Sequence, residues 1–559
     1  MSNLQVDERD QEFVLYEQLQ IEKFSQADCF KDFSRDIYDM VLSEAQRLSA
    51  NSMAPANAKG DEEGCRQEGG KVIVPESFHE LWSKYNEAGW MTISDSTEVG
   101  GQGMPIAIGL AASEYFIAAN LAFTTYTGLT SGAARLIQNY GTEEQKKKYM
   151  ENMFSGKWGG TMVLTEPGAG SDVGALKTTA KRLSDGTFSI TGTKIFISAG
   201  DHNLTENIIH PVLAKIEGAP AGTKGISIFI VPKIRVNADG SLGEPNDINV
   251  GGVEHKMGIK GSATCLLNFG DKGKCIGELL GEENSGMRVM FQMMNEARLG
   301  VGHQGAAVAG TAYLHALDYA RERVQGSDIR EFRNPEATRV PIIHHPDVRR
   351  MLLWMKAYTE GFRVLNLYAA YCFDQERMAT NEEEKKKWDG MAALLTPVCK
   401  AYCSDMGFRV CETAMQVYGG YGYIHEYPVE QFLRDQKIAS IYEGTNGIQA
   451  LDMVARKLGM GKGTIFLNYI QEINQFCEEQ KGHEILGFCI ELLETAKNAL
   501  AEVTFFFAQK GKEDFVVPVL YATPYLELFG DVTLGWLLLW QAVLAQEKFR
   551  ALAKKKGAK

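Results

Sequence analysis

Glu443 is the residue whose surroundings first point to chemistry. The apolar residues Ile438, Ala439 and Ile441 lead into it, and Gly444 follows it directly. A carboxyl group at the end of an apolar run can lose part of its hydration, which raises its pKa toward the range useful to a general base. A single Glu more often caps a helix or faces solvent, so Glu443 taken alone leaves both roles open.

The segment TEPGAGSD (165–172) is a second candidate. It follows the apolar run MVL (162–164). A turn of this composition exposes backbone N–H groups and hydroxyls that can cradle a phosphate or the edge of a ring. An ordinary connecting turn has the same composition. A dinucleotide fingerprint is excluded, because Gly168, Gly170 and Gly174 lack the GxGxxG spacing.

Another glycine-rich segment and two arginines complete the candidates. The glycines of QVYGGYGY (416–423) suit a close approach of the backbone to a ligand. Arg298 follows a run rich in Met, and Arg323 lies in YARERVQG. Each arginine needs a partner, either in an ordinary ion pair or in the phosphate or amide of a ligand.

The elements that position these residues form four segments. Apolar spacing near 3.6 predicts helices before residue 160 and after residue 283. Between them, TFSITGTKIFISAG (187–200) and GISIFIVPK (225–233) alternate in the way that predicts antiparallel strands, and no parallel dinucleotide-binding sheet is expected. We predict a mainly α chain with a middle β domain, divided into residues 1–160, 161–282, 283–460 and 461–559.

Composition narrows the class of protein. The chain has 559 residues, 45% of them hydrophobic and 23% charged, which predicts three to four globular domains and excludes disorder. The net charge of −13 argues against a general nucleic-acid binder. The 57 glycines indicate many tight turns or close backbone approaches.

Targeting and metal signals are weak. The N-terminal sequence does not have the pattern of a secretory signal, and the longest apolar run (534–545) is short for a membrane span, so we expect a cytoplasmic protein. The ten cysteines contain no CxxC pair, which favours reduced, buried thiols. The adjacent His344 and His345 are poorly spaced for chelation, and we expect no metal.

Six motifs together resemble one family. TEPGAGSD, TGTKIFISAG, MGIKGSATC, YARERVQG, QVYGGYGYIHEYPVEQFLRD and IYEGTNGIQ occur in the order and spacing of the acyl-CoA dehydrogenases, over about residues 80–456. The tract 197–233 and the C-terminal segment look most like the subgroup of 3-methylmercaptopropionyl-CoA and long-chain fatty acyl-CoA dehydrogenases. The resemblance implies an N-terminal helical domain, a β-barrel-like middle domain, a C-terminal four-helix bundle and an extra helical domain.

The resemblance also implies a reaction. The family uses FAD to convert an acyl-CoA thioester into a trans-2-enoyl-CoA and passes the electrons to an electron-transfer flavoprotein. Glu443 matches the base that removes the Cα proton while a hydride leaves Cβ for flavin N5. Its backbone N–H and a ribityl hydroxyl of FAD would polarise the thioester carbonyl. The C-terminal addition would favour a homodimer over a tetramer.

Further site residues are carried over by resemblance. Phe196 takes the place of a Trp, and Asn295 that of an Asp, whereas Gly447 and Gly326 depart from the family and are not carried over. A second base position of the family falls at Ala297, and Glu296 would point away from it. The FAD residues are then Met162, Leu164, Thr165, Ser171, Phe196, Ser198, Arg323, Gln416, Gly420 and Thr445, and the substrate residues are Ser171, Asn295, Arg298, Tyr442 and Gly444.

Other functions remain open on the sequence. An acyl-CoA oxidase would reduce O₂ on the same fold, and a flavin-dependent hydroxylase or nitroalkane oxidase would lack the Glu. A pseudo-enzyme would keep the fold without catalysis, which Glu443 and TEPGAGSD together disfavour. The acyl group is also open, including a 3-methylmercaptopropionyl group, because pocket depth depends on side chains such as Met162, Tyr126 and Thr127.

Overall fold

The computed structural model describes residues 4–556, which form two compact units. Unit 1 comprises Met1–Arg47, Pro105–Ala118 and Arg298–Lys559, and unit 2 comprises Leu48–Met104 and Ala119–Ala297. Each unit combines segments that are far apart in the sequence. The division into four domains therefore stays a prediction.

Unit 2 begins with helices and one small hairpin. Gly69 and Gly70, both with positive φ, turn the chain between the two strands of that hairpin. This hairpin interrupts the helices that the sequence predicts before residue 160. The elements are α3 (Ala54–Glu63), β1 (Arg66–Glu68), β2 (Lys71–Ile73), α4 (Ser77–Glu87), the later part of α5 (Ile106–Tyr140), α6 (Glu143–Phe154) and the first part of α7 (Gly286–Glu322).

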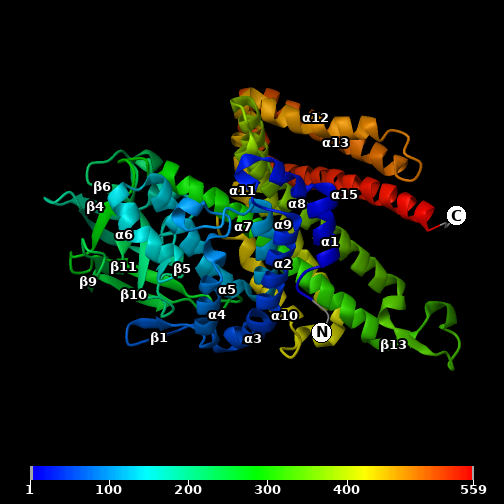
Figure 1. Cartoon of the computed structure of the whole chain (residues 1–559), viewed down its shortest axis with the longest axis horizontal. Coiled ribbons are helices and arrows are strands. Elements are labelled where there is room, and N and C mark those ends of the chain that lie inside the picture. Colours follow the sequence, from blue (N-terminus) through cyan, green and yellow to red (C-terminus); the bar gives the residue numbers. More distant parts are fainter. Residues whose placement is uncertain (1–3, 557–559) are drawn as a thin grey trace. The chain divides into compact units, whose positions relative to one another are not determined.

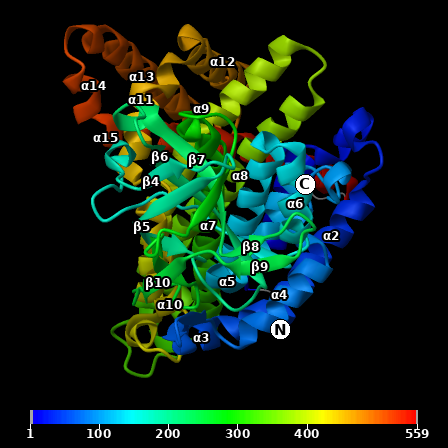
Figure 2. The same cartoon turned by 90° about the vertical axis from the view of Figure 1, so that its left-hand side faces the viewer.

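The predicted β segment folds into a closed ring of strands, several of which are labelled in Figure 2. The ring runs β4–β5–β12–β7–β6 and returns to β4, while β11 and β10 extend from β5. The strands are β3 (Trp158–Gly160), β4 (Thr179–Arg182), β5 (Phe188–Ser198), β6 (Asn207–Ile216), β7 (Ile226–Pro232), β8 (Ile234–Val236), β9 (Leu242–Pro245), β10 (Ile248–Val253), β11 (Thr264–Phe269) and β12 (Ile276–Leu279).

The antiparallel prediction holds for most pairs and fails for two. β6 pairs in parallel with β4 and with β3. The ring has five members, and alternating strand directions cannot close around an odd number. One parallel pair is therefore required, and β4–β6 supplies it.

A bulge interrupts the alternation of β5. The pairing with β11 shifts register between Cys265 and Leu267, and on β5 this shift lies at Ile195 and Phe196. Phe196 has a φ of 57° and leaves its ring 60% exposed, whereas Ile197 is buried. Ile195, two residues before Ile197, is only partly buried. The extra residues of a bulge reverse the inward and outward order beyond it.

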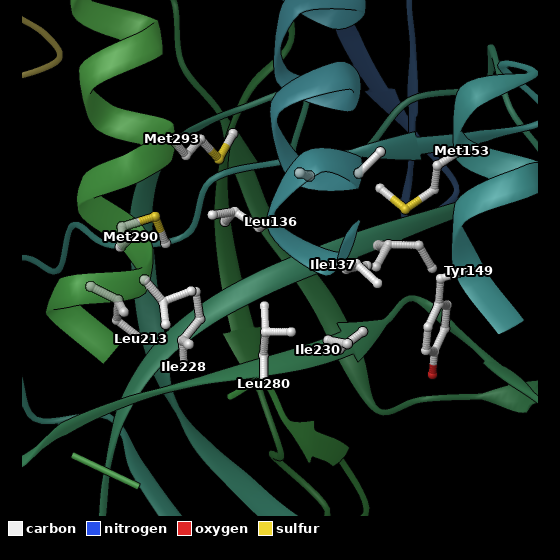
Figure 3. Packing of buried hydrophobic residues seen from close by; sticks show 14 of the residues in the cluster. Leu136, Ile137, Tyr149, Met153, Leu213, Ile228, Ile230, Leu280, Met290 and Met293 are labelled. Carbon is white, nitrogen blue, oxygen red and sulfur yellow. The ribbon is translucent and has the colours of Figure 1, made fainter. Parts of the chain in front are cut away.

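The core of unit 2 lies between this sheet and three helices (Figure 3). Leu136 and Ile137 of α5, Tyr149 and Met153 of α6, and Met290 and Met293 of α7 pack with strand residues such as Leu213, Ile228 and Ile230. Burial of side chains of this size contributes about 1.5–3 kcal/mol each before entropy is counted. This packing fixes the sheet on which the candidate cofactor residues stand.

Unit 1 is a helical bundle with a helical addition (Figure 1). α8 and α9 pack along one another, and α15 packs on α8, α9, α11 and α13. The elements are α1 (Glu8–Glu12), α2 (Arg35–Leu48), the later part of α7, β13 (Val324–Ser327), β14 (Arg339–Pro341), α8 (Pro346–Met378), α9 (Glu382–Tyr418), α10 (Val429–Gln436), α11 (Asn446–Ala455), α12 (Thr464–Glu479), α13 (Gly487–Glu513), α14 (Val516–Leu520) and α15 (Ala522–Lys555).

Two features determine where α9 begins and how closely it packs on α7. The side chain of Asn381 accepts a hydrogen bond from the backbone N–H of Glu384, which caps the helix at its first turn. Gly302 and Gly305 of α7 face α9 so closely that a Cβ would lie 2.5 and 2.6 Å from its backbone. Glycine is therefore required where α7 crosses α9.

A buried ion cluster joins three segments of unit 1. Arg363 of α8 is only 3% exposed, and its guanidinium donates to Glu114 at 2.7 and 2.9 Å and to Asp10. Gln11 also donates to the Glu114 carboxylate at 2.9 Å. A buried carboxylate needs such partners, because an unpaired charge away from water is costly.

The apolar run 534–545 belongs to a longer helix than the sequence suggested. By length and composition alone, α5 and α15 could each cross a membrane. Of their apolar stretches, 78% in α5 and 44% in α15 are buried inside the protein. Buried core helices meet the same criterion. Leu534 and Leu537, for example, are 5% and 0% exposed.

The cysteines are free thiols, and most are buried. Seven of the ten are buried and Cys65 is partly buried, but Cys29 and Cys489 are exposed, so the prediction of buried thiols fails at these two. Across residues 4–556, no group of three or more His, Cys, Asp or Glu side chains is placed to hold a metal ion.

Candidate active site

Glu443 lies in a strained turn between two helices of unit 1. It follows a short helical turn (Lys437–Ser440) and has a φ of 57°, and Gly444 has a φ of 82°. Thr445 then caps α11, because its hydroxyl accepts a hydrogen bond from the backbone N–H of Ile448 at 3.3 Å. A non-glycine residue in the left-handed region is uncommon and is often found at functional sites.

Gln449 of α11 fixes this turn from inside. Its side-chain amide donates to the backbone carbonyls of Glu443 at 3.3 Å and of Gly444 at 3.2 Å. A Cβ at Gly444 would lie 2.7 Å from the same amide nitrogen. Glycine is needed at position 444 for both its φ and its lack of a side chain.

The carboxyl group of Glu443 is desolvated. Its Oε2 atom is buried and has no hydrogen-bond partner among residues 4–556. Burial raises the pKa of Glu443 to about 7, although the positive charges of Lys400 and Arg298 oppose that rise. A carboxyl group with this pKa is half ionised near neutral pH and can accept a proton from a substrate.

Two predicted substrate residues lie beside the same turn. Arg298 of α7 is 4% exposed and pairs with Asp452 of α11 at 3.4 Å. One of its nitrogens lies 3.7 Å from where a Cβ at Gly444 would stand. The phenol of Tyr442 donates to the side-chain carbonyl of Gln304 on α7. The structure thus brings Arg298, Tyr442, Glu443, Gly444 and Thr445 together in unit 1.

The predicted flavin residues of unit 2 also meet one another. The segment 162–165 runs beside β5, where the backbone N–H of Ile195 donates to the carbonyl of Thr165 at 2.9 Å. Phe196 presents its exposed ring on the same strand, and Ser198 lies two residues further along. The hydroxyls of Thr165 and Ser198 make no hydrogen bond to another described residue.

A buried ion pair anchors this surface, and the sequence reading missed it. Lys194 is fully buried, and its Nζ donates to the carbonyls of Leu164 at 2.9 Å and Leu213 at 2.8 Å. The same Nζ lies 2.9 Å from the Glu166 carboxylate, which also accepts hydrogen bonds from Thr178. Lys194 lies an even number of residues after the buried Phe188 on β5, and such residues share one face of a strand. This spacing could have predicted that the side chain of Lys194 is buried.

The residues of unit 2 fit a flavin. An exposed aromatic face and two hydroxyls that are free of hydrogen bonds to described residues suit the isoalloxazine ring of FAD. A glycine turn suits its diphosphate. A Cβ at Gly168 or Gly170 would meet no heavy atom within 4 Å, and Ser171 beside them is exposed. Met162 and Leu164 are partly buried under the same turn.

The remaining predicted residues lie elsewhere. Arg323 lies over the ring of Tyr421 at 5.2 Å, beside Gly420 in a short exposed turn (Gly419–Tyr423), and Gln416 is exposed on α9. In unit 2, the side-chain oxygen of Asn295 is buried without a hydrogen-bond partner. Glu296 is exposed and pairs with Arg135 at 3.3 Å.

Models of one protein family match almost the whole chain. The acyl-CoA dehydrogenase N-terminal, middle and C-terminal domains match residues 36–157, 161–271 and 284–459. A model described as acetyl-CoA dehydrogenase C-terminal like matches residues 469–558. The extra helical segment therefore also resembles a described domain of acyl-CoA dehydrogenase type.

Full-length relatives agree with the models. The chain is 38% identical to 3-methylmercaptopropionyl-CoA dehydrogenase of Ruegeria pomeroyi, over 92% of this chain and 87% of the relative. It is 39% identical to the broad-specificity linear acyl-CoA dehydrogenase FadE5 of Mycobacterium tuberculosis, over 98% of this chain and 91% of the relative.

Solved structures agree as well. An acyl-CoA dehydrogenase of Bacillus anthracis complexed with FAD is 25% identical, with a TM-score of 0.74 over 94% of this chain and 84% of that one. The fold, the enzyme class and the cofactor that the six motifs implied are thereby confirmed. The chain belongs to the acyl-CoA dehydrogenase family of FAD-dependent oxidoreductases.

Proposed function

We propose that this enzyme dehydrogenates an acyl-CoA thioester between Cα and Cβ, giving a trans-2-enoyl-CoA, with Glu443 as the base. The observation that carries the assignment is the Glu443 carboxyl, which is desolvated, has no hydrogen-bond partner at Oε2 and has a pKa raised to about 7. A buried carboxyl group without a hydrogen-bond partner lowers the stability of the folded protein. Groups with strongly shifted pKa values cluster at functional sites.

The turn at Glu443 and Gly444 supports two roles for Glu443, one for its side chain and one for its backbone N–H. Glu443 and Gly444 both have a left-handed φ, which turns the chain sharply at this point. In this proposal the side chain and the backbone N–H of Glu443 act on the same thioester. The carboxylate would remove the Cα proton, and the backbone N–H would donate to the thioester carbonyl, which stabilises the developing enolate-like charge. FAD, when bound, supplies the acceptor for the hydride that leaves Cβ.

We propose that FAD rests on the surface of unit 2 described above. Met162, Leu164 and Thr165 would line the ring, Phe196 would stack on it, and Ser198 would offer a hydroxyl. The exposure of the Phe196 ring supports this placement, because a large aromatic face 60% exposed on a rigid strand suits a planar ligand. Ser171 would contact the diphosphate.

The electron acceptor and the oligomeric state are proposed from the resemblance to the family. The electron acceptor would be an electron-transfer flavoprotein, and a homodimer would bring Arg323, Gln416 and Gly420 to the FAD of a second subunit. The ten free cysteines support a reducing, cytoplasmic compartment. The relatives' names include both a 3-methylmercaptopropionyl and a broad linear acyl specificity, so a panel of acyl-CoA esters must identify the acyl group.

The test is anaerobic bleaching of the flavin band by an accepted acyl-CoA. Glu443→Gln should retain FAD yet bleach roughly 10²- to 10⁴-fold more slowly, because the amide cannot accept the proton. Glu296→Gln, at an exposed position on α7, is the matched control and should bleach like the wild type. Bleaching of Glu443→Gln at the wild-type rate would remove Glu443 from the mechanism.

The oxidase alternative is tested on the reduced enzyme. Reoxidation by an electron-transfer flavoprotein that is much faster than by air supports a dehydrogenase. Rapid reoxidation by O₂, with one peroxide formed per turnover, would instead assign the protein as an acyl-CoA oxidase.

A further inference from the structure

One turn of α9 holds the start of α11, three residues beyond Glu443. The Nζ of Lys400 donates to the side-chain oxygen of Asn446 at 2.7 Å. The side-chain nitrogen of Asn446 donates to the hydroxyl of Ser404 at 2.9 Å and to the carbonyl of Ala401 at 3.2 Å. Asn446 is therefore tied to α9 from both ends of its amide, and the turn that carries Glu443 is tied with it.

Lys400 is a fully buried cation whose hydrogen-bond partner is neutral. Its exposure is 0%, and Asn446 is the acceptor of its hydrogen bond. The pKa of Lys400 is lowered to about 7, mainly by burial and slightly by the charge of Arg298, while the negative charges of Asp405 and Glu443 oppose this decrease. Asp405 is exposed on α9, where water screens its charge. Glu443 is thus the buried anion within range of Lys400.

The positive charges of two side chains lower the pKa of Glu443, those of Lys400 on α9 and Arg298 on α7. They differ in what else they bind. Arg298 forms an ion pair with Asp452, which in turn pairs with Arg456 at 2.7 Å. Asp452 thus lies between two guanidinium groups, whereas the hydrogen bond of Lys400 goes to the neutral amide of Asn446.

We propose that Lys400 is a positioning residue for the Glu443 base, which it serves in two ways: its ammonium group holds the catalytic turn through Asn446, and its charge keeps the buried carboxylate ionised. This inference rests on the proposed function, since it gives Lys400 a role only if Glu443 is the base. Lys400 need not touch the substrate or the flavin to act in this way.

The two tasks can be separated by substitution. Lys400→Gln keeps an N–H donor for Asn446 but removes the charge, and Lys400→Arg keeps the charge. Asn446→Ala breaks the tether but leaves the charge. An effect of charge moves the pH dependence of proton removal, whereas an effect of the tether lowers the rate equally at every pH.

The experiment measures the rate of anaerobic flavin bleaching from pH 5.5 to 9.5 on the FAD-loaded enzyme. In Lys400→Gln the acid limb should move up by about one pH unit, because an opposite charge nearby lowers a carboxyl pKa by one or more units. The rate at pH 6 should then fall about tenfold, and the rate above pH 9 should approach that of the wild type. Lys400→Arg should keep the wild-type limb, and Asn446→Ala should lose rate without moving it.

Several results would overturn the inference. A wild-type acid limb in Lys400→Gln refutes the role of charge, and a pH-independent loss equal to that of Asn446→Ala reduces Lys400 to a structural tether. If Lys400→Gln does not retain FAD, Lys400→Met carries the same prediction, and loss of the fold in both refutes the proposal. Glu443→Gln is run alongside: if it bleaches at the wild-type rate, the proposed function fails, whatever Lys400 does.

Discussion

The raised pKa of Glu443 predicts that the catalytic carboxyl destabilises its own protein. The carboxyl has a pKa of about 7 in the folded chain, against an ordinary value of 4.5. Since one pKa unit corresponds to about 1.4 kcal/mol, the free energy of unfolding loses about 3 kcal/mol to this group at high pH.

The sign follows from proton binding. Between pH 4.5 and 7 the folded state keeps the proton that the unfolded state has released, so the stability from this group is fully present below 4.5 and is lost as pH rises through 7. Glu443→Gln cannot ionise and escapes this loss. Relative to the wild type, the variant should therefore gain stability as pH rises.

The assay is a thermal scan of the FAD-loaded wild type and Glu443→Gln at pH 5 and pH 8.5. With an unfolding entropy near 2.1 cal/mol/K per residue, a cooperative unit of roughly 300 residues, the order of size of unit 1, converts 3 kcal/mol into about 5 °C. The variant should melt about 5 °C above the wild type at pH 8.5 and close to it at pH 5.

A matched control removes one carboxylate elsewhere in unit 1. Glu412→Gln, at an exposed position on α9, should show the same small difference from the wild type at both pH values. If the gap between Glu443→Gln and the wild type does not change with pH, the carboxyl is not desolvated as the structure indicates, and the argument for Glu443 as a base near neutral pH loses its support.

Three further predictions test the turn, the flavin surface and the buried ion cluster. Gly444→Ala should lower the bleaching rate at least tenfold without loss of FAD, because its Cβ would lie 2.7 Å from Gln449 at a φ of 82°. Gly447→Ala should keep the wild-type rate, because its Cβ would lie 3.9 Å from the nearest atom. Phe196→Ala should weaken FAD binding about three- to tenfold in a titration, and Phe196→Trp should not, if the ring stacks on the flavin. Arg363→Met leaves the Glu114 carboxylate buried without its cation, so calorimetry should show a loss of about 3–5 kcal/mol, whereas an unchanged Tm would mean that the cluster is hydrated.

The parts of the site that depend on local sequence patterns could be predicted from the sequence. The glycine after Glu443 and the order of the six motifs are one-dimensional features, and they identified the family and the candidate base. The helical and β segments followed from apolar periodicity, which depends only on side-chain spacing. The alternation in β7 was also correct, although both of its faces are buried in the ring.

The tertiary structure decided what depends on distant contacts. The closure of five strands into a ring required a parallel pair that no local pattern encodes. The bulge at Phe196 arises from pairing with β11 and turns that ring outward. Lys400 lies 43 positions before Glu443, and only the packing of α9 on the start of α11 brings its charge within range of the carboxyl. The sequence by itself thus determined which residues could do the chemistry, while burial and the neighbouring charges, which exist only in the folded chain, set the pKa at which Glu443 can act.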